Sequence, residues 1–158
     1  RNPLLIAGNL ALFGILLYHF DRVGKKSKDL GDMNLTTALA VGFAQAMAIV
    51  PGVSRSGITI TTALALGFSR NSAARFSFLL SAPITAGAGL LKFKYIYATL
   101  VEGGPMATAV IAGFGASLVS GLFAVSALNY LVKSRSFGIF TVYRVALALV
   151  IVTIVVVR

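Results

Sequence analysis

The sequence predicts an all-α, polytopic membrane bundle with about four spanning helices and one re-entrant helical hairpin, built as a single transmembrane domain over residues 1–158. Of the 158 residues, 58% are hydrophobic and 11% charged, against about 45–50% and 25% in soluble proteins. Apolar runs of roughly 20 residues recur, which is the length needed to cross a bilayer. A polar segment at residues 51–57, "PGVSRSG", interrupts two shorter apolar runs.

The residue types present exclude several classes of function. The chain has no cysteine, which removes disulfides, thiol catalysis and cysteine metal sites, and its only histidine, His19, excludes a histidine metal cluster within the chain. The net charge is +10, but the basic residues lie mostly at the ends of apolar runs. That pattern favours lipid headgroups over nucleic acid as the partner. Because the chain opens at Arg1 without a signal peptide, we expect a portion of a longer protein.

The first apolar run, residues 2–20, is long enough to span the bilayer. His19, close to its end, is typical of an anchor at the membrane interface. Residues 21–34 follow as a polar linker with four basic residues and three of the four acids of the chain. We expect this linker to be a solvated loop outside the bilayer.

The two apolar runs around the polar segment are too short to span alone. Residues 36–50 and 58–68 would reach about 22 Å and 16 Å as helices, against a hydrocarbon core of roughly 30 Å. One continuous helix would instead bury the break at Pro51 and place Arg55 near mid-membrane, at about 2.5–3.5 kcal/mol for the arginine. A re-entrant hairpin over residues 36–68 with an unwound tip at 51–57 fits better, and its tip is expected to line a polar cavity.

A second spanning helix is predicted over residues 76–91, with a kink at Pro83. Asn71 or Ser72 is available to cap its start. Residues 92–105 contain basic, aromatic and turn residues in the order expected of an interfacial loop.

Two further helices complete the predicted bundle, over residues 106–132 and 137–157. The first carries Gly113, Ser117 and Gly121 at four-residue spacing. Such a stripe lets helices approach closely, so we interpret it as a packing surface.

The basic residues predict an orientation. We call the open end of the hairpin, near residues 36 and 68, its mouth. If the mouth lies on one side of the membrane, that side receives eight basic residues and the other side four. The eight are Arg22, Lys25, Lys26, Lys28, Arg70, Arg75, Lys133 and Arg135, and the four are Arg1, Lys92, Lys94 and Arg158. The excess puts the mouth in the cytoplasm, so that the tip points toward the outer face.

The tip carries the chemistry of an anion site. An arginine at membrane depth is a functional residue by default, and its planar fork fits phosphate or carboxylate oxygens. Nearby hydroxyls can donate hydrogen bonds, glycines allow backbone N–H groups to form a nest, and a helix starting near residue 58 adds positive charge. The candidates are Arg55 and Ser54 as catalytic residues, and Ser56, Gly57, Thr59, Gly52 and Gln45 as substrate-binding residues.

Some of these assignments have structural alternatives. Arg55 could pair with a buried acid or cap a helix C-terminus. The four acids, Asp21, Asp29, Asp32 and Glu102, all lie in predicted loops, which argues against a pair within the chain. Gln45 could bond between helices instead, Arg144 could face the cavity or extend outward, and Arg75 is expected at the interface.

The segment "GFAQAMAIVPGVSRSGITITTALALGFSRNSAARFSFLLSAPITAGAG", residues 42–89, closely resembles the second signature region of the undecaprenyl-diphosphate phosphatase family, the bacitracin-resistance membrane phosphatases. Its PGxSRSG string, followed by SRxxAxxFSFLLxxP, is long and ordered. Phe140, Tyr143 and Arg144 agree with a weaker pattern near the end. The resemblance covers essentially the whole chain, as the C-terminal portion of such a protein.

This resemblance implies two inverted halves, each with a re-entrant hairpin, in the bacterial inner membrane. The implied activity is removal of the terminal phosphate of undecaprenyl diphosphate at the outer face, which returns the lipid carrier to cell-wall synthesis. Arg55 would hold the diphosphate, assisted by Ser54, Ser56 and Thr59.

The resemblance also implies parts that this chain lacks. The family's first signature, a glutamate-rich stretch leading into a serine- and histidine-containing hairpin, is absent from the sequence. The implied divalent cation, Mg²⁺ or Ca²⁺, therefore has no ligands in this chain. The implied partners are a polyprenyl diphosphate lipid, the membrane, and the N-terminal half or a complementary chain, while a homodimer stays open.

Two other hypotheses remain open at this point. A transporter or channel could bind an anion at a re-entrant loop for passage, because carriers also use broken helices near the bilayer midplane. The chain could also be an inactive membrane-packing module.

Overall fold

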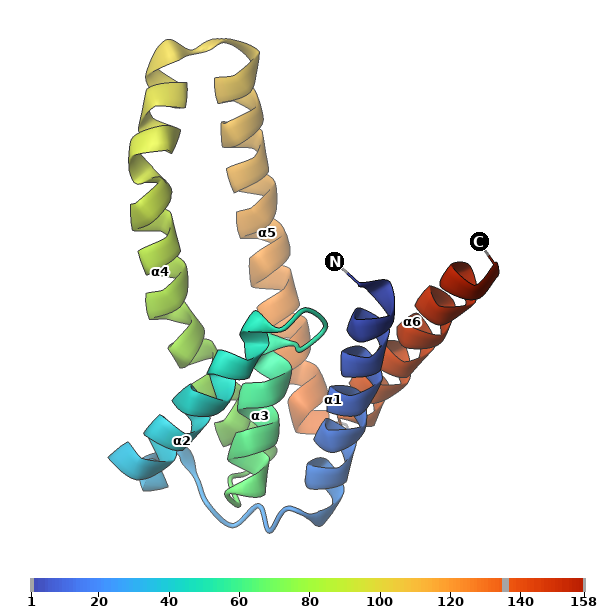
Figure 1. The fold of residues 1–158 in the computed structure, drawn as a ribbon. Helices are drawn as coiled ribbons and strands as arrows, with labels where there is room; N and C mark the ends of the chain where they lie inside the picture. The colour runs from blue at the N-terminus through green and yellow to red at the C-terminus, as the bar shows by residue number, and fades with distance from the viewer. Residues whose placement is uncertain (1, 135–136, 158) are drawn as a thin grey trace. The chain divides into compact units, whose positions relative to one another are not determined.

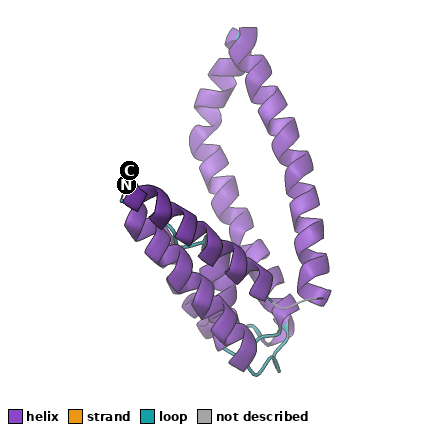
Figure 2. Ribbon diagram, turned by 90° about the vertical axis from the view of Figure 1, so that its right-hand side faces the viewer, coloured by secondary structure: helices purple, strands orange, loops and turns teal. Residues whose placement is uncertain are grey.

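The computed structural model describes residues 2–134 and 137–157, apart from the side chains at 129 and 131–134. In chain order the elements are α1 (Pro3–Val23), the 3₁₀ turn η1 (Leu30–Asp32), α2 (Leu35–Ala46), the 3₁₀ turn η2 (Met47–Ile49), α3 (Arg55–Ala65), α4 (Arg70–Glu102), α5 (Gly104–Ser134) and α6 (Gly138–Val157) (Figure 1). The described part of the chain contains no strand (Figure 2), which confirms the all-α class.

Within the described residues, four helices are long and apolar enough to cross a membrane: α1, α4, α5 and α6. This confirms the predicted number of spanning helices and a multi-pass membrane protein. The apolar segment Leu35–Ile49 is shorter. Its pairing with α3 gives the helix–break–helix pattern predicted around residues 51–57.

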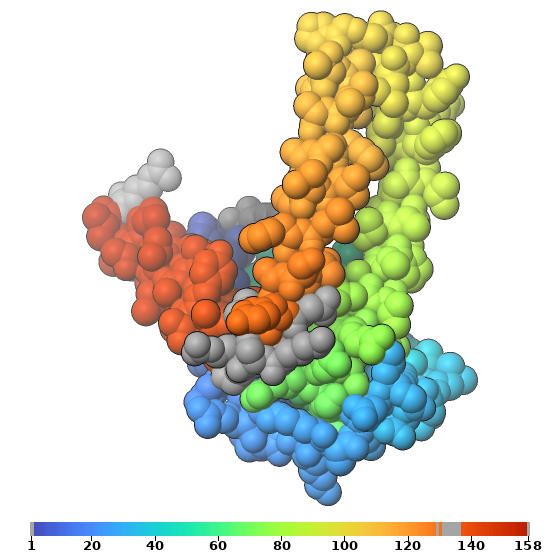
Figure 3. Space-filling model, turned by 180° about the vertical axis from the view of Figure 1, so that it is seen from behind, coloured from blue at the N-terminus to red at the C-terminus, as the bar shows by residue number. Residues whose placement is uncertain are grey.

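The chain divides into two compact units. The first comprises Arg1–Phe78 and Val132–Arg158, and the second comprises Leu79–Leu131. In the second unit the turn at Gly103 joins α4 to α5, and most described side chains between residues 79 and 131 are exposed (Figure 3). An apolar surface of this kind is suited to lipid or to other membrane helices.

In the first unit, α1 packs most extensively on α6, which runs antiparallel to it, and also on α3 (Figures 1 and 2). Small residues make this packing close: Ala7, Gly14 and Ala148 are buried. Phe13, Val53 and Ile58 form a hydrophobic cluster that ties the hairpin to α1. Near the turn, the hairpin is therefore held against α1 by apolar burial.

The predicted loop over residues 92–105 is wrong, because α4 continues to Glu102 and the chain turns only at Gly103 and Gly104. Polarity indicates where a helix can leave the hydrocarbon, and this segment has no helix breaker before the two glycines. The predicted cap also differs. The Ser69 hydroxyl accepts the Ser72 N–H at 3.3 Å, so the capping side chain lies two or three residues before the expected Asn71 or Ser72.

Two boundaries near the hairpin also differ from expectation. α3 begins at Arg55, three residues earlier than predicted, because Ser54 acts as its N-cap. α1 extends to Val23, so Asp21 belongs to a helix and not to the linker. Of the residues in the orientation count, Arg1, Arg135 and Arg158 lie outside the described residues, as does the Lys133 side chain.

Candidate functional site

The tip of the hairpin is a tight turn between η2 and α3. Pro51 ends the helical path because it has no N–H to donate. Gly52 adopts φ +91°, and a Cβ there would lie 2.6 Å from the Ile6 carbonyl oxygen. Only glycine combines this backbone angle with so close an approach to α1.

The first turn of α3 presents unpaired donors. The Ser54 hydroxyl accepts the Gly57 N–H at 3.1 Å and lies 3.4 Å from the Ser56 hydroxyl. The N–H groups of Arg55 and Ser56, like those at any helix start, have no partner among the described residues. Together with the positive end of the helix, these groups favour an anion.

Arg55 is exposed at the start of α3. It forms no ion pair in the described part of the chain, which includes all four acids. The alternative in which Arg55 pairs with a buried acid of this chain therefore has no support in the structure. Its charge is available to a ligand.

Two other predicted site residues, Thr59 and Gln45, do not present free polar groups at the tip in the same way as Arg55. Thr59 is buried, and its hydroxyl contacts the Arg55 and Ser56 carbonyls at 3.1 Å and the Ser77 hydroxyl at 2.7 Å. Its hydrogen-bonding capacity is thus used between α3 and α4. Gln45 is half-buried on α2, and its side chain makes no hydrogen bond to the tip among the described residues.

Two residues outside the predicted set contact the turn directly. The Asn9 side-chain amide donates to the Pro51 carbonyl at 2.8 Å. Arg144, left open between two orientations by the sequence, is buried and donates from Nη2 to the Gly52 carbonyl at 3.0 Å. An amide within the apolar run of residues 2–20 was the available signal for Asn9, because polar groups in membrane helices usually bond across helices.

The hairpin lies along α1. Asn9, beside the turn, lies about 21 Å along the helix from its Val23 end. At the opposite end of the hairpin, Lys28 and Phe68 form an isolated bridge beside the α3–α4 turn. The turn therefore lies beside the N-terminal part of α1, where Gly52 approaches Ile6. The re-entrant placement of the hairpin in the membrane stays a prediction.

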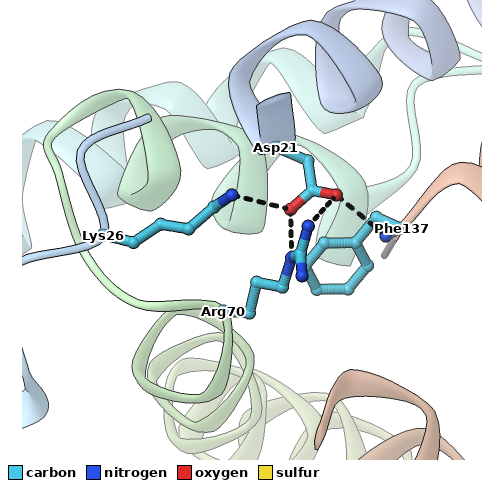
Figure 4. A network of polar contacts seen from close by, with 4 residues as sticks. All are labelled: Asp21, Lys26, Arg70 and Phe137. Atoms are coloured by element: carbon cyan, nitrogen blue, oxygen red, sulfur yellow. Dashed lines mark hydrogen bonds and ion pairs between the residues drawn. The ribbon is translucent and has the colours of Figure 1, made fainter. Parts of the chain in front are cut away.

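A buried ion pair lies near the mouth of the hairpin (Figure 4). The Asp21 carboxylate accepts from Arg70 Nε at 2.5 Å and Nη2 at 2.9 Å, and from the Phe137 N–H at 3.0 Å. Lys26 Nζ lies 4.0 Å from the same carboxylate. The expectation that Asp21 is in a solvated loop is wrong, because Asp21 is buried in the last turn of α1 and bonded to Arg70 and Phe137.

The described residues do not fit a metal ion. No group of three or more His, Asp or Glu side chains comes together among them. The tip offers no carboxylate or imidazole, and its Arg55 and helix start favour anions. The buried carboxylate of Asp21 is engaged with Arg70. A cation at the tip would need ligands from outside this chain.

The described residues define a multi-pass helical membrane protein with a broken hairpin, whose tip carries an exposed arginine at a helix start. The family model described as "Bacitracin resistance protein BacA" matches residues 1–150. The chain belongs to this family.

Several curated relatives are named undecaprenyl-diphosphatase. That of Moorella thermoacetica is 47% identical over 98% of this chain and 57% of its own length. That of Trichlorobacter lovleyi is 47% identical over 92% and 53%, and that of Desulforudis audaxviator is 44% identical over 100% and 59%. The chain thus spans a little over half the length of the relatives it matches.

Proposed function

We propose that the full-length protein hydrolyses undecaprenyl diphosphate to undecaprenyl phosphate and inorganic phosphate, and that this chain supplies the phosphate-binding hairpin. The observation that carries the proposal is the exposed Arg55, without an acid partner in the described chain, at a helix start with unpaired N–H groups. Family membership and the name that the relatives share support the same reaction.

The reaction needs a nucleophile, a proton donor or metal for the leaving group, and positive charge for the phosphoryl oxygens. Attack on the terminal phosphorus breaks its bond to the bridging oxygen, and the electron pair leaves with the lipid phosphate. Arg55 would neutralise oxygens of the transferred phosphoryl group. The Ser56 hydroxyl and the hydrogen of the Ser54 hydroxyl would donate to the same oxygens, since the Ser54 oxygen accepts from Gly57.

The remaining groups are proposed to come from outside this chain, from the rest of the full-length protein or a partner chain. A general base, a proton donor and ligands for a divalent cation belong to this set. The described tip holds hydroxyls and a guanidinium but no carboxylate or imidazole that could act as a base. A homodimer is one way to complete the site.

The protein is proposed to lie in the bacterial inner membrane with the tip toward the outer face. The excess of basic residues on the mouth side supports this orientation. Arg70 is one of the counted residues and is engaged with Asp21, so its charge is not free for lipid headgroups. Arg22, Lys25 and Lys28 on the same side are exposed.

The test is phosphate release from a polyprenyl diphosphate by the full-length protein in detergent micelles. We expect Arg55→Ala to lower kcat/KM by about 100-fold or more, the usual effect of removing one preorganised donor. The kcat/KM of Arg55→Lys is expected to lie between those of the unmodified protein and Arg55→Ala, because an ammonium keeps the charge but loses the planar fork. Arg75→Ala is the matched control, because Arg75 is exposed on α4 and no hydrogen bond or ion pair joins it to the tip among the described residues.

Near-unmodified rates in Arg55→Ala would contradict the assignment of Arg55. Flux of a labelled anion into proteoliposomes without phosphate release would favour a transporter instead. The observation that favours this second function is the broken hairpin, because carriers also bind their substrates at broken helices.

A further inference from the structure

Two side chains from different helices hold consecutive carbonyl groups of the turn. Asn9 on α1 donates to the Pro51 carbonyl at 2.8 Å, and Arg144 on α6 donates to the Gly52 carbonyl at 3.0 Å. Helices α1 and α6 are the most extensively packed pair in the structure. We call Asn9 and Arg144 the clasp.

The clasp is built into the packing and is not a surface contact. Arg144 is only 6% exposed, and Gly14 gives room to its stem, since a Cβ there would lie 3.4 Å from Arg144 Cβ. A Cβ on Gly57 would lie 2.7 Å from Arg144 Nη1, so the guanidinium rests directly against the first turn of α3. The absence of a side chain at Gly57 leaves the space that the Arg144 guanidinium occupies.

Arg144 and Arg55 lie on different sides of α3. Residues two apart in a helix point in nearly opposite directions, so the face that Gly57 turns to Arg144 is not the face that carries Arg55. Exposure agrees, because Arg55 is exposed whereas Gly57 is buried. The guanidinium of Arg144 thus supports the turn from the protein side.

The clasp has an electrostatic consequence for an anion. Carbonyl oxygens carry partial negative charge, and two of them at the tip would repel phosphate if they faced it. Asn9 and Arg144 hold the Pro51 and Gly52 carbonyls toward α1 and α6. Arg144 Nε has no partner among the described residues, and no acid of the chain neutralises its charge.

We propose that Asn9 and Arg144 are positioning residues that lock the turn so that the N–H groups and hydroxyls of the first turn of α3 point away from the clasp, toward the anion. This inference rests on the proposed phosphate-binding function of the same tip. Neither residue is assigned a contact with the phosphate.

The experiment measures opening of the turn and activity separately. Val53 is 8% exposed within the cluster beneath the turn. Because the chain has no cysteine, Val53→Cys supplies a unique thiol once any cysteine elsewhere in the full-length protein is replaced by serine. The rate of its labelling by a maleimide is measured in micelles, alone and combined with Asn9→Leu, Arg144→Met or Arg144→Lys.

Thr141→Val is the matched control. The Thr141 hydroxyl donates to the Gly14 carbonyl at 2.9 Å, so it joins α6 to α1 near Arg144 without contacting the turn. A labelling increase that follows loss of any α1–α6 hydrogen bond would appear in this variant too. An effect specific to the clasp would not.

We expect Asn9→Leu and Arg144→Met to raise the Val53→Cys labelling rate by at least about tenfold, the effect of losing a hydrogen bond that involves a charged or buried group. Arg144→Lys, which keeps a donor, is expected to restore most of the protection, and Thr141→Val to change the rate less than about twofold. Phosphate release, measured without the Val53 substitution, is expected to fall in the same order.

Unchanged labelling in both clasp variants would overturn the proposal, even if phosphate release falls, because Arg144 would then act by direct contact with substrate. Equal increases in Thr141→Val would also overturn it. Failure of the proposed function gives a different result: labelling rises as expected, while the unmodified protein releases no phosphate. The clasp would then position the tip for another anion-binding role.

Discussion

Ser54 combines two roles at a single position. Its oxygen accepts the Gly57 N–H and so caps α3, while its hydrogen remains available to the neighbouring Ser56 hydroxyl or to an anion. The sequence predicted only the second role. The cap became visible once the structure showed that α3 starts at Arg55, because a capping residue is defined by where the helix begins.

Substitution of Ser54 separates these roles. Ser54→Ala removes the cap and is expected to lower the free energy of unfolding by about 1 kcal/mol. Ser54→Asn keeps a capping oxygen and is expected to retain the stability while losing the hydroxyl. Thermal unfolding in micelles and phosphate release measure the two effects. Equal destabilisation in both variants would contradict the capping role.

Gly57 is predicted to tolerate no side chain. A Cβ there would lie 2.7 Å from Arg144 Nη1 and 3.0 Å from Ser54 Cβ, so Gly57→Ala must displace the guanidinium or the cap. We expect a loss of about 1–3 kcal/mol in stability, as for other overpacked sites. Gly42→Ala is the control, because Gly42 lies in α2 with no atom within 4 Å of the added Cβ, and alanine favours a helix. Thermal unfolding measures the stability of both variants. Equal losses in Gly57→Ala and Gly42→Ala would contradict a specific lack of space at Gly57.

Thr59 is a predicted site residue that also makes a structural contact. Its hydroxyl lies 2.7 Å from that of Ser77, so the pair joins α3 to α4 within the first unit. Thr59 remains a predicted ligand by resemblance. Its burial at 1% exposed favours a structural contribution, because a buried hydroxyl is costly to leave without a partner.

Between elements, the contact that the sequence concealed is the Asp21–Arg70 pair. One carboxylate joins the end of α1, the start of α4 and the Phe137 N–H just before α6. Asp21 stands among lysines and aspartates in the sequence, where a solvated loop is the ordinary interpretation. Its partner is 49 residues away. The polarity of neighbouring residues therefore cannot predict this ion pair.

Asp21→Asn is predicted to weaken the first unit. Breaking a buried ion pair typically costs about 3–5 kcal/mol. Because the Arg70 side chain is 30% exposed, we expect a loss below that range, about 2 kcal/mol. Thermal unfolding in micelles measures the change. Lys26→Met is the control, since Lys26 lies 4.0 Å from the carboxylate and is 30% exposed, and a small effect is expected. A loss in Lys26→Met as large as in Asp21→Asn would contradict the Arg70 pair as the main contact.

The largest error in the predicted helix boundaries is the end of α4. Lys92 and Lys94 and the tyrosines around them are typical of a membrane interface, and we predicted a loop there. Residues at an interface can remain helical, and α4 ends only at two glycines with φ +71° and +77°. Polarity reports the surroundings of a helix, whereas its end depends on backbone breakers.

For the molecule as a whole, orientation in the membrane is the prediction with the most direct test. Ser27→Cys places a thiol in the linker on the mouth side, and Glu102→Cys places one at the end of α4; both positions are exposed. With the mouth in the cytoplasm, we expect a membrane-impermeant maleimide to label Glu102→Cys in intact cells and Ser27→Cys only after permeabilisation. The reverse pattern would invert the proposed orientation.

The sequence by itself determined the membrane class, the four spanning helices, the break at Pro51 and the family, because hydrophobic length, helix breakers and an ordered motif are local properties. It also predicted Arg55 as a site residue, since an arginine between two apolar runs is recognisable from its neighbours alone. Only the tertiary structure decided which polar groups meet. Asn9 and Arg144 reach the turn, and Asp21 reaches Arg70, through helix packing. Such pairings depend on distances between segments far apart in the chain, and no local pattern encodes them.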